Sequence, residues 1–298
     1  MASISESTLK QYSSGLKLWW DYCSTKKADP YSVSVVTVLE FLTYHFKKGA
    51  SYSSLNTYRS AIAQVAGRDL AQDYRIQKFF KGVYMLRPSL PKYQNTWDPA
   101  VVLNFLREWK NKDITLRKLN QKLVTLLALA TGQRLQTLAL IEITHICKSE
   151  IEINIAVPQR IKTSGKDRSQ PFFHLPFLNS DPEVCVARVI LTYLEKTENL
   201  RGSETSLILA SKMPYCKAST QTLSRWIKII LEKSGIDVHK FSAHSTRHAA
   251  TSAAKRKGLN MDTIRLSAGW SRDSRMFAQV YNRPLFSDQT CAEAVLTC

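Results

Sequence analysis

The chain has 298 residues, of which 44% are apolar, and this is enough to bury a sizeable core and to form two domains. Its 42 Lys and Arg residues against 24 Asp and Glu give a net charge of +18, which favours a polyanion, most often nucleic acid, as the partner. The six cysteines form no C-x-x-C pair, which argues against a zinc ribbon or a dense disulfide framework, and no apolar run is long enough to span a membrane.

The basic excess is spread over both parts of the chain. Residues 1–96 carry 13 basic and 6 acidic side chains, and the remainder is basic as well. A polyanion that touches both parts fits this distribution better than one basic arm, although scattered surface lysines on an ordinary soluble protein are the alternative. Because no secretory leader is recognisable at Met1, we expect the nucleus if the host is eukaryotic, and otherwise the cytoplasm.

Residues 1–86 predict an N-terminal domain of four short helices. Ser34 precedes the second helix, and the fourth repeats Ile76, Phe79, Phe80 and Val83 at helical spacing. Outward-facing cations on these helices are candidate DNA contacts, with ordinary solvated helix faces as the alternative. The candidates are Arg59, Lys78 and Lys81.

Residues 87–98 predict a linker, because they are proline-rich and lack a helical period, and residues 99–298 form the second domain. Residues 150–157 alternate as a strand does, and Phe172 to Leu175 reads as the strand that returns from a basic hairpin tip. The fold class is therefore mainly α with a small antiparallel β-sheet. Helices are expected near 99–110, 116–131, 182–197, 219–234, 245–257, 260–268 and 273–281.

A phosphate-handling site is indicated by the sequence His244-x-x-Arg247-His248. If a helix begins near His244, all three side chains share one face. Arg247 offers a permanent planar cation, His244 can exchange a proton near neutral pH, and the hydroxyl of Tyr281 is a possible nucleophile. A metal bound by the two histidines is disfavoured, because the motif lacks the Glu of H-E-x-x-H and a third ligand. A packed structural role for His248 is the favoured interpretation.

Two more cations belong to the candidate site. Arg134 follows a buried apolar helix and Gly132, where an arginine is costly unless it faces a ligand, caps a helix or meets an acid. Lys162 lies in the basic hairpin tip, which either contacts phosphate or is a solvated turn. Trp270, like Tyr281, would be a core aromatic if it were considered by itself.

Taken in order, these motifs resemble the tyrosine recombinase (phage-integrase-like) family. Thr131-Gly132-Gln133-Arg134 is similar to its first box, His244-x-x-Arg247-His248 to its second, and Gly269-Trp270 to its Gly-His/Trp position. The resemblance implies a two-domain clamp on double-stranded DNA, a homo-tetramer that works through a Holliday junction, and strand cleavage through a 3′-phosphotyrosine without metal, ATP or other cofactor. It implies the catalytic set Arg134, Lys162, His244, Arg247, Trp270 and Tyr281. The amino-acid sequence around Arg134 and Tyr281 is similar to that of recombinases of eukaryotic mobile elements, the DIRS-like and Crypton groups.

Two features depart from the family pattern. Thr137 stands where many members have an acid that supports the first arginine, and Trp270 and Tyr281 are farther apart than is common. The helix that carries the tyrosine could therefore start later, or the tyrosine could enter the site from a neighbouring subunit. A DNA-binding protein that kept the fold but lost activity, and a tyrosine-type relaxing topoisomerase, remain alternatives. The tail at 284–298 either docks into a neighbour or folds on its own domain.

Overall fold

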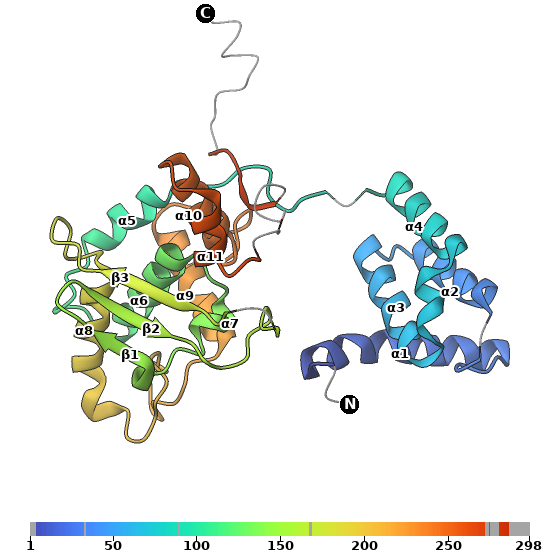
Figure 1. The fold of residues 1–298 in the computed structure, drawn as a ribbon, viewed down its shortest axis with the longest axis horizontal. Helices are drawn as coiled ribbons and strands as arrows, with labels where there is room; N and C mark the ends of the chain where they lie inside the picture. The colour runs from blue at the N-terminus through green and yellow to red at the C-terminus, as the bar shows by residue number, and fades with distance from the viewer. Residues whose placement is uncertain are drawn as a thin grey trace, which may run out of the picture. The chain divides into compact units, whose positions relative to one another are not determined.

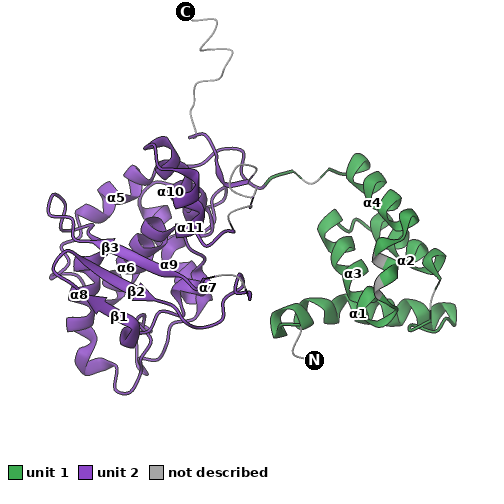
Figure 2. Cartoon of the chain, viewed as in Figure 1, with its two compact units in different colours: residues 1–91 green, residues 92–298 purple. Residues whose placement is uncertain are grey.

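The chain divides into two compact units, residues 1–91 and residues 92–298 (Figure 2). In this computed structural model the described residues are 4–32, 34–88, 90–166, 169–271, 274 and 280–285. Each unit has its own apolar core. Among the described residues, no helix has the length and apolar character needed to cross a membrane.

Unit 1 is built from α-helices of 13 to 21 residues and a short 3₁₀ helix, which enclose an aromatic-rich core (Figure 1). Its core includes the fully buried Phe41, Leu55 and Ile76. Each helix of this unit places apolar residues at helical spacing along one face, and burial of these faces against each other stabilises the four predicted helices. The elements are α1 (Glu6–Lys26), α2 (Val35–Lys47), α3 (Tyr52–Val65), the 3₁₀ helix η1 (Arg68–Gln72) and α4 (Tyr74–Leu86).

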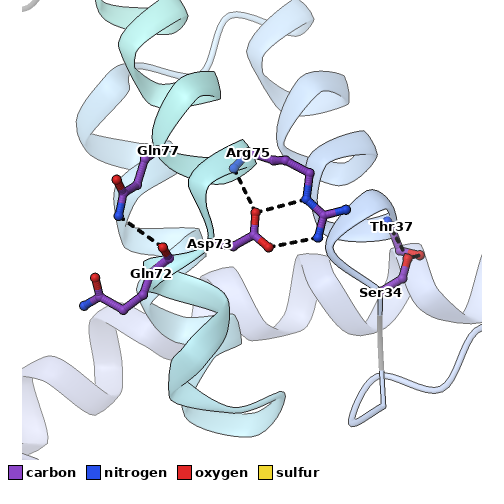
Figure 3. A network of polar contacts seen from close by, with 6 residues as sticks. All are labelled: Ser34, Thr37, Gln72, Asp73, Arg75 and Gln77. Carbon is purple, nitrogen blue, oxygen red and sulfur yellow. Dashed lines mark hydrogen bonds and ion pairs between the residues drawn. The ribbon is translucent and has the colours of Figure 1, made fainter.

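Side-chain caps fix the starts of α2 and α4, as Figure 3 shows. The Ser34 hydroxyl accepts a hydrogen bond from the Thr37 amide at 3.2 Å. The Asp73 carboxylate accepts from the Arg75 amide at 2.8 Å and also pairs with the Arg75 guanidinium at 2.8 Å. The hydrogen bond from this guanidinium lowers the pKa of Asp73 to about 2. These caps satisfy amides that an α-helix leaves without partners in its first turn.

Unit 2 is centred on a buried helix, α6 (Leu116–Thr131), which packs against α8, α9 and α10. The α6 residues Leu119, Leu123 and Leu127 have no exposed surface. The remaining helices are α5 (Pro99–Arg107), α7 (Leu135–Leu138), α8 (Val186–Thr197), α9 (Thr220–Lys233), α10 (Ser245–Arg256) and α11 (Met261–Ser267), with 3₁₀ helices η2 (Ile143–His145) and η3 (Glu198–Leu200).

A three-stranded antiparallel sheet lies in unit 2 in the order β1-β2-β3 (Figure 1). Its strands are β1 (Ile146–Lys148), β2 (Glu152–Ala156) and β3 (Phe172–Pro176). Ile153 pairs with Leu175 and Ile155 with Phe173, and these four side chains face the core. The predicted fold class, mainly α with a small antiparallel sheet, is confirmed.

Some expectations were incomplete or fall outside the described residues. The pairing of the 150–157 and 172–175 segments is observed, but β1 was not predicted, because three partly exposed residues carry no alternation. The helix expected at 273–281 falls on a stretch of which only residues 274, 280 and 281 are described. Of the tail at 284–298, only residues 284 and 285 are described.

Residues 92–97, which belong to the stretch expected to be a linker, pack with unit 2. Tyr93 and Trp97 are 5% and 3% exposed and lie in the larger core. The Trp97 indole donates to the Ser245 hydroxyl at 2.9 Å, and the Thr96 amide donates to the Pro284 carbonyl at 2.8 Å. This segment therefore lies against both the start of α10 and the chain beyond residue 281.

Candidate active site

Arg247 lies at the centre of the site and is 1% exposed. It belongs to the first turn of α10, and its Nη1 donates to the Gly132 carbonyl at 2.5 Å. Gly132 ends α6 with a φ of +59°, a left-handed conformation that favours glycine, and an added Cβ would come within 3.2 Å of the Thr251 side chain. Because glycine lets the backbone at the end of α6 come close to α10, the Gly132 carbonyl can hold the Arg247 guanidinium in place.

The Arg247 guanidinium is only partly satisfied. Its central carbon lies 4.1 Å from the ring centre of Trp270 and 5.2 Å from that of Tyr281. Within the described part of the chain, its buried Nε and Nη2 have no hydrogen-bond partner. Burial, and then repulsion from Arg134, lower the pKa of Arg247 to about 10, with Tyr281 acting in the opposite direction. The group remains a buried cation with donors to spare at neutral pH, which is costly unless an anion completes it.

Tyr281 lies beside Arg247 of its own chain and is 8% exposed. Its hydroxyl is 3.1 Å from Nε2 of His244. Its ring stacks on His248 at a centroid distance of 4.3 Å and lies 4.8 Å from Trp270. The phenol therefore has a possible proton acceptor on one side and a buried cation on another, within one protomer.

His244 directly precedes α10. The residue is exposed, but part of its ring is shielded from solvent by protein atoms. Desolvation, followed by the charges of Arg247, Arg134, Lys92 and Lys162, lowers the pKa of His244 below its ordinary value. The imidazole is then neutral at pH 7 and able to accept a proton. The same effect shows that four cations lie within electrostatic range of this ring.

Arg134 and Lys162 approach the site from two loops. Arg134 is half-buried, lies two residues beyond the end of α6 at Gly132 and occupies the N-cap position of α7. None of the ion pairs among the described residues involves it. Lys162 is exposed in the loop between β2 and β3, directly after the buried Ile161.

The turn that carries Trp270 is held by Gln133. The Gln133 amide nitrogen donates to the Ser267 carbonyl at 2.7 Å. Gly269 has a φ of +68°, and a Cβ added there would come within 3.1 Å of the Gln133 side chain. Trp270 follows directly, so the loop of Arg134 and the turn of Trp270 are fitted to each other.

His248 packs beneath the site. It is 5% exposed, lies between Tyr93 and Tyr281, and its Nδ1 has no hydrogen-bond partner among the described residues. Burial, then the charges of His244, Arg283 and Arg247, lower the pKa of His248 to about 4. The part of the chain that is described contains no group of three His, Cys, Asp or Glu residues arranged for a metal ion.

Sequence reasoning missed several residues that hold this site together. Trp97 donates a hydrogen bond to Ser245, the charge of Lys92 lowers the pKa of His244, and Ser252 donates a hydrogen bond to the Tyr281 carbonyl. A signal existed for two of them: Trp97 is a large aromatic in a proline-rich stretch, and Ser252 lies four residues after His248, on the same face of the helix. The bond from Ser252 reaches a backbone atom, which no sequence pattern marks.

The three predicted DNA contacts in unit 1 divide into two kinds. Lys78 and Lys81 are exposed on α4, as expected of groups that meet a ligand or only water. Arg59 was expected to face outward and is instead half-buried, with its guanidinium carbon 5.0 Å from the ring centre of Phe80 and its Nε buried. Stacking on the aromatic ring explains this, because the apolar faces of a guanidinium pack readily on a ring while its edges stay polar.

Comparisons with known proteins give one family match and several solved structures of similar fold. The Phage integrase family model matches residues 98–287. The chain is similar to the XerH site-specific recombinase bound to difH substrate in a pre-cleavage complex (TM-score 0.62, 16% identity, covering 96% of this chain and 78% of that one). It is also similar to a lambda integrase tetramer bound to a Holliday junction (0.55, 15%, 97% and 75%) and to the Tn1549 transposon integrase with transposon right end DNA (0.55, 17%, 89% and 84%). At these identities the structural matches establish a shared fold, and no curated protein sequence matches the chain.

Proposed function

Because the chain belongs to the phage integrase family, we propose that it cuts and rejoins duplex DNA at specific sites through a 3′-phosphotyrosine intermediate. One observation carries the proposal. A buried Arg247 with two unpartnered donor nitrogens lies beside Tyr281, whose hydroxyl is within hydrogen-bond distance of an imidazole held neutral by its surroundings. A cation that stabilises the phosphate oxyanion, a nucleophile and a base are the parts that phosphoryl transfer to a tyrosine needs.

The cations supply the binding of the scissile phosphate. Arg247 donates from Nε and Nη2, and Arg134 donates to the same phosphate, so that the non-bridging oxygens are held as negative charge grows on them. The indole N–H of Trp270 adds a hydrogen bond to the same phosphate. A bound phosphate also relieves the repulsion between the two arginines that lowers the pKa of Arg247.

The chemical step is a transesterification. The Tyr281 oxygen attacks phosphorus in line, a new P–O bond forms, and the bond from phosphorus to the 5′ oxygen breaks. The phenol proton passes to Nε2 of His244, and Lys162 protonates the departing 5′ oxygen. A 5′-hydroxyl from the same or another strand reverses the step, because the ester bond retains the energy of the original linkage. The strand is thus rejoined without ATP.

The remaining parts of the proposal concern the DNA and the assembly. Unit 1 and unit 2 form a clamp on double-stranded DNA, with Lys78 and Lys81 on phosphates, and a homo-tetramer exchanges strands between two duplexes. Support comes from the net charge of +18 and from the tetramer on a Holliday junction formed by the lambda relative. We propose a mobile element of a eukaryotic host as its source, because the sequence around Arg134 and Tyr281 resembles such recombinases. In a eukaryotic host it would act in the nucleus, and otherwise in the cytoplasm.

The test is covalent trapping on a nicked duplex, from which the cleaved 5′ fragment diffuses away. The wild type forms a protein–DNA adduct, whereas Tyr281→Phe, which keeps the ring packed on His248 and Trp270, forms none and binds DNA with unchanged affinity. Tyr31→Phe, at a tyrosine that is 60% exposed, is the matched control and retains the adduct. An adduct that persists in Tyr281→Phe removes this residue from the role, and a wild type that only binds favours the inactive DNA-binding alternative.

A further inference from the structure

Ser252 joins the helix of the cationic motif to the chain on either side of residue 282. It lies on α10, the helix of Arg247 and His248, and is 1% exposed. Its hydroxyl donates to the Tyr281 carbonyl at 2.7 Å and accepts from the Arg283 amide at 3.0 Å. One buried hydroxyl thus satisfies two backbone groups, the carbonyl that precedes Asn282 and the amide that follows it.

Ser252 uses its hydroxyl differently from the neighbouring threonine of α10. A serine or threonine inside a helix commonly bonds back to the carbonyl four residues earlier. The neighbouring Thr251 does so, with its hydroxyl 2.7 Å from the Arg247 carbonyl. Ser252 instead both donates a hydrogen bond to a separate segment and accepts one from it. This indicates that its role is to hold that segment.

A second attachment lies just beyond. The Thr96 amide donates to the Pro284 carbonyl, and Thr96 and Leu285 form an isolated parallel bridge. The short stretch 281–285 is therefore fixed to α10 at one end and to residues before α5 at the other. Both attachments lie within unit 2, so a single protomer determines where the phenol sits.

We propose that Ser252 is a positioning residue for the nucleophile, an inference that rests on the proposed function. By fixing the backbone of Tyr281 it keeps the hydroxyl 3.1 Å from His244 and the ring against Arg247. Without the hydroxyl, two backbone groups in a buried place lose their partner, and the segment shifts to find others. A shift of about 1 Å in a reacting group lowers a rate by about 100-fold.

The experiment compares single-turnover cleavage of a nicked duplex at saturating DNA. Ser252→Ala is expected to cleave about 10- to 100-fold more slowly with unchanged DNA affinity, and Ser252→Thr, which keeps the hydroxyl, to recover to within about threefold of wild type. The matched control is Thr125→Val, since the one hydrogen bond of that buried hydroxyl to any described residue stays within its own helix, at 2.8 Å from the Gln121 carbonyl. It is expected to leave the rate unchanged.

Amide hydrogen exchange provides a readout that does not depend on activity. In Ser252→Ala, the Arg283 amide and its neighbours at 281–285 exchange at least about tenfold faster, because the acceptor is lost, while amides within α10 keep their protection. Equal loosening of α10 overturns the proposal in favour of a general structural role, as does an unchanged cleavage rate. If the wild type forms no adduct, the proposed function fails, and exchange alone then decides whether Ser252 anchors the segment: unchanged exchange at 281–285 refutes it and faster exchange supports it.

Discussion

Acid should destabilise unit 2 through His248, and the size of the effect follows from its surroundings. The ring is 5% exposed, and burial together with nearby positive charges lowers its pKa from 6.5 to about 4. In the unfolded chain the same histidine takes up a proton near pH 6.5, whereas in the folded chain it does so only near pH 4. The unfolded state therefore binds more protons between these values, and the free energy of unfolding falls as the pH falls through this window.

The magnitude is set by the width of the window. One pKa unit corresponds to about 1.4 kcal/mol. Protonation of His248 therefore lowers the free energy of unfolding by about 3 kcal/mol between neutral pH and a pH below 4. Above pH 6.5 the histidine is neutral in both states and has no such effect. A loss of about 3 kcal/mol is a large fraction of the 5–15 kcal/mol that stabilises a typical domain, so the change should be easy to measure.

The assay is urea denaturation at pH 7 and at pH 4.5, with the unfolding of unit 2 followed by exchange of amides in α6. The comparison is with His248→Phe, whose flat ring can still stack on Tyr281 but cannot be protonated. Carboxylates also titrate in this range, but they do so in both proteins, and the difference isolates the histidine. We expect the wild type to lose about 2–3 kcal/mol more than His248→Phe. Equal losses would refute a neutral, buried His248.

Two further predictions concern the cleavage mode and the DNA contacts. Since Tyr281 lies beside Arg247 of its own chain, mixing Tyr281→Phe protein with Arg247→Ala protein should give no more adduct than either alone, and restored adduct would show that the tyrosine acts on a neighbour's site. Lys78→Gln and Lys81→Gln should each weaken DNA binding and lower the slope of log affinity against log salt by about one unit, measured by fluorescence anisotropy. A slope that stays at the wild-type value would leave these lysines as solvated surface groups.

Local pattern was sufficient for most of the fold. The helix α6 and the strand β2 were predicted because their apolar residues repeat with the period of the element that they form, and β3 was predicted as the strand that returns from the basic hairpin tip. The missing pieces, β1 and α7, have three and four residues, too few to show a period. They exist because the core places their backbone next to a partner, which is information that the local sequence does not contain.

The site divides in the same way. The common face of His244, Arg247 and His248 follows from spacing alone, because one helix carries it. The contact of Gly132 with Arg247 joins residues 115 positions apart and was not predicted. The resemblance to known recombinases implied only that Arg134 and Arg247 belong to one site. Ser252 was not anticipated, since its partners are backbone atoms of residues 281 and 283.

The missing acid at position 137 changes the electrostatics of the site. Among the described groups whose charges shift the pKa of His244, all are cations, and Arg134 acts in the same direction on Arg247. Thr137 is 2% exposed and brings no countercharge. Within the described part of the chain, no carboxylate is among the charges that act on His244 and Arg247, and a phosphodiester is a group that would neutralise these cations. Binding DNA should then raise the pKa of His244 toward its ordinary value, so that the imidazole becomes a stronger base at the moment when Tyr281 has a phosphate to attack.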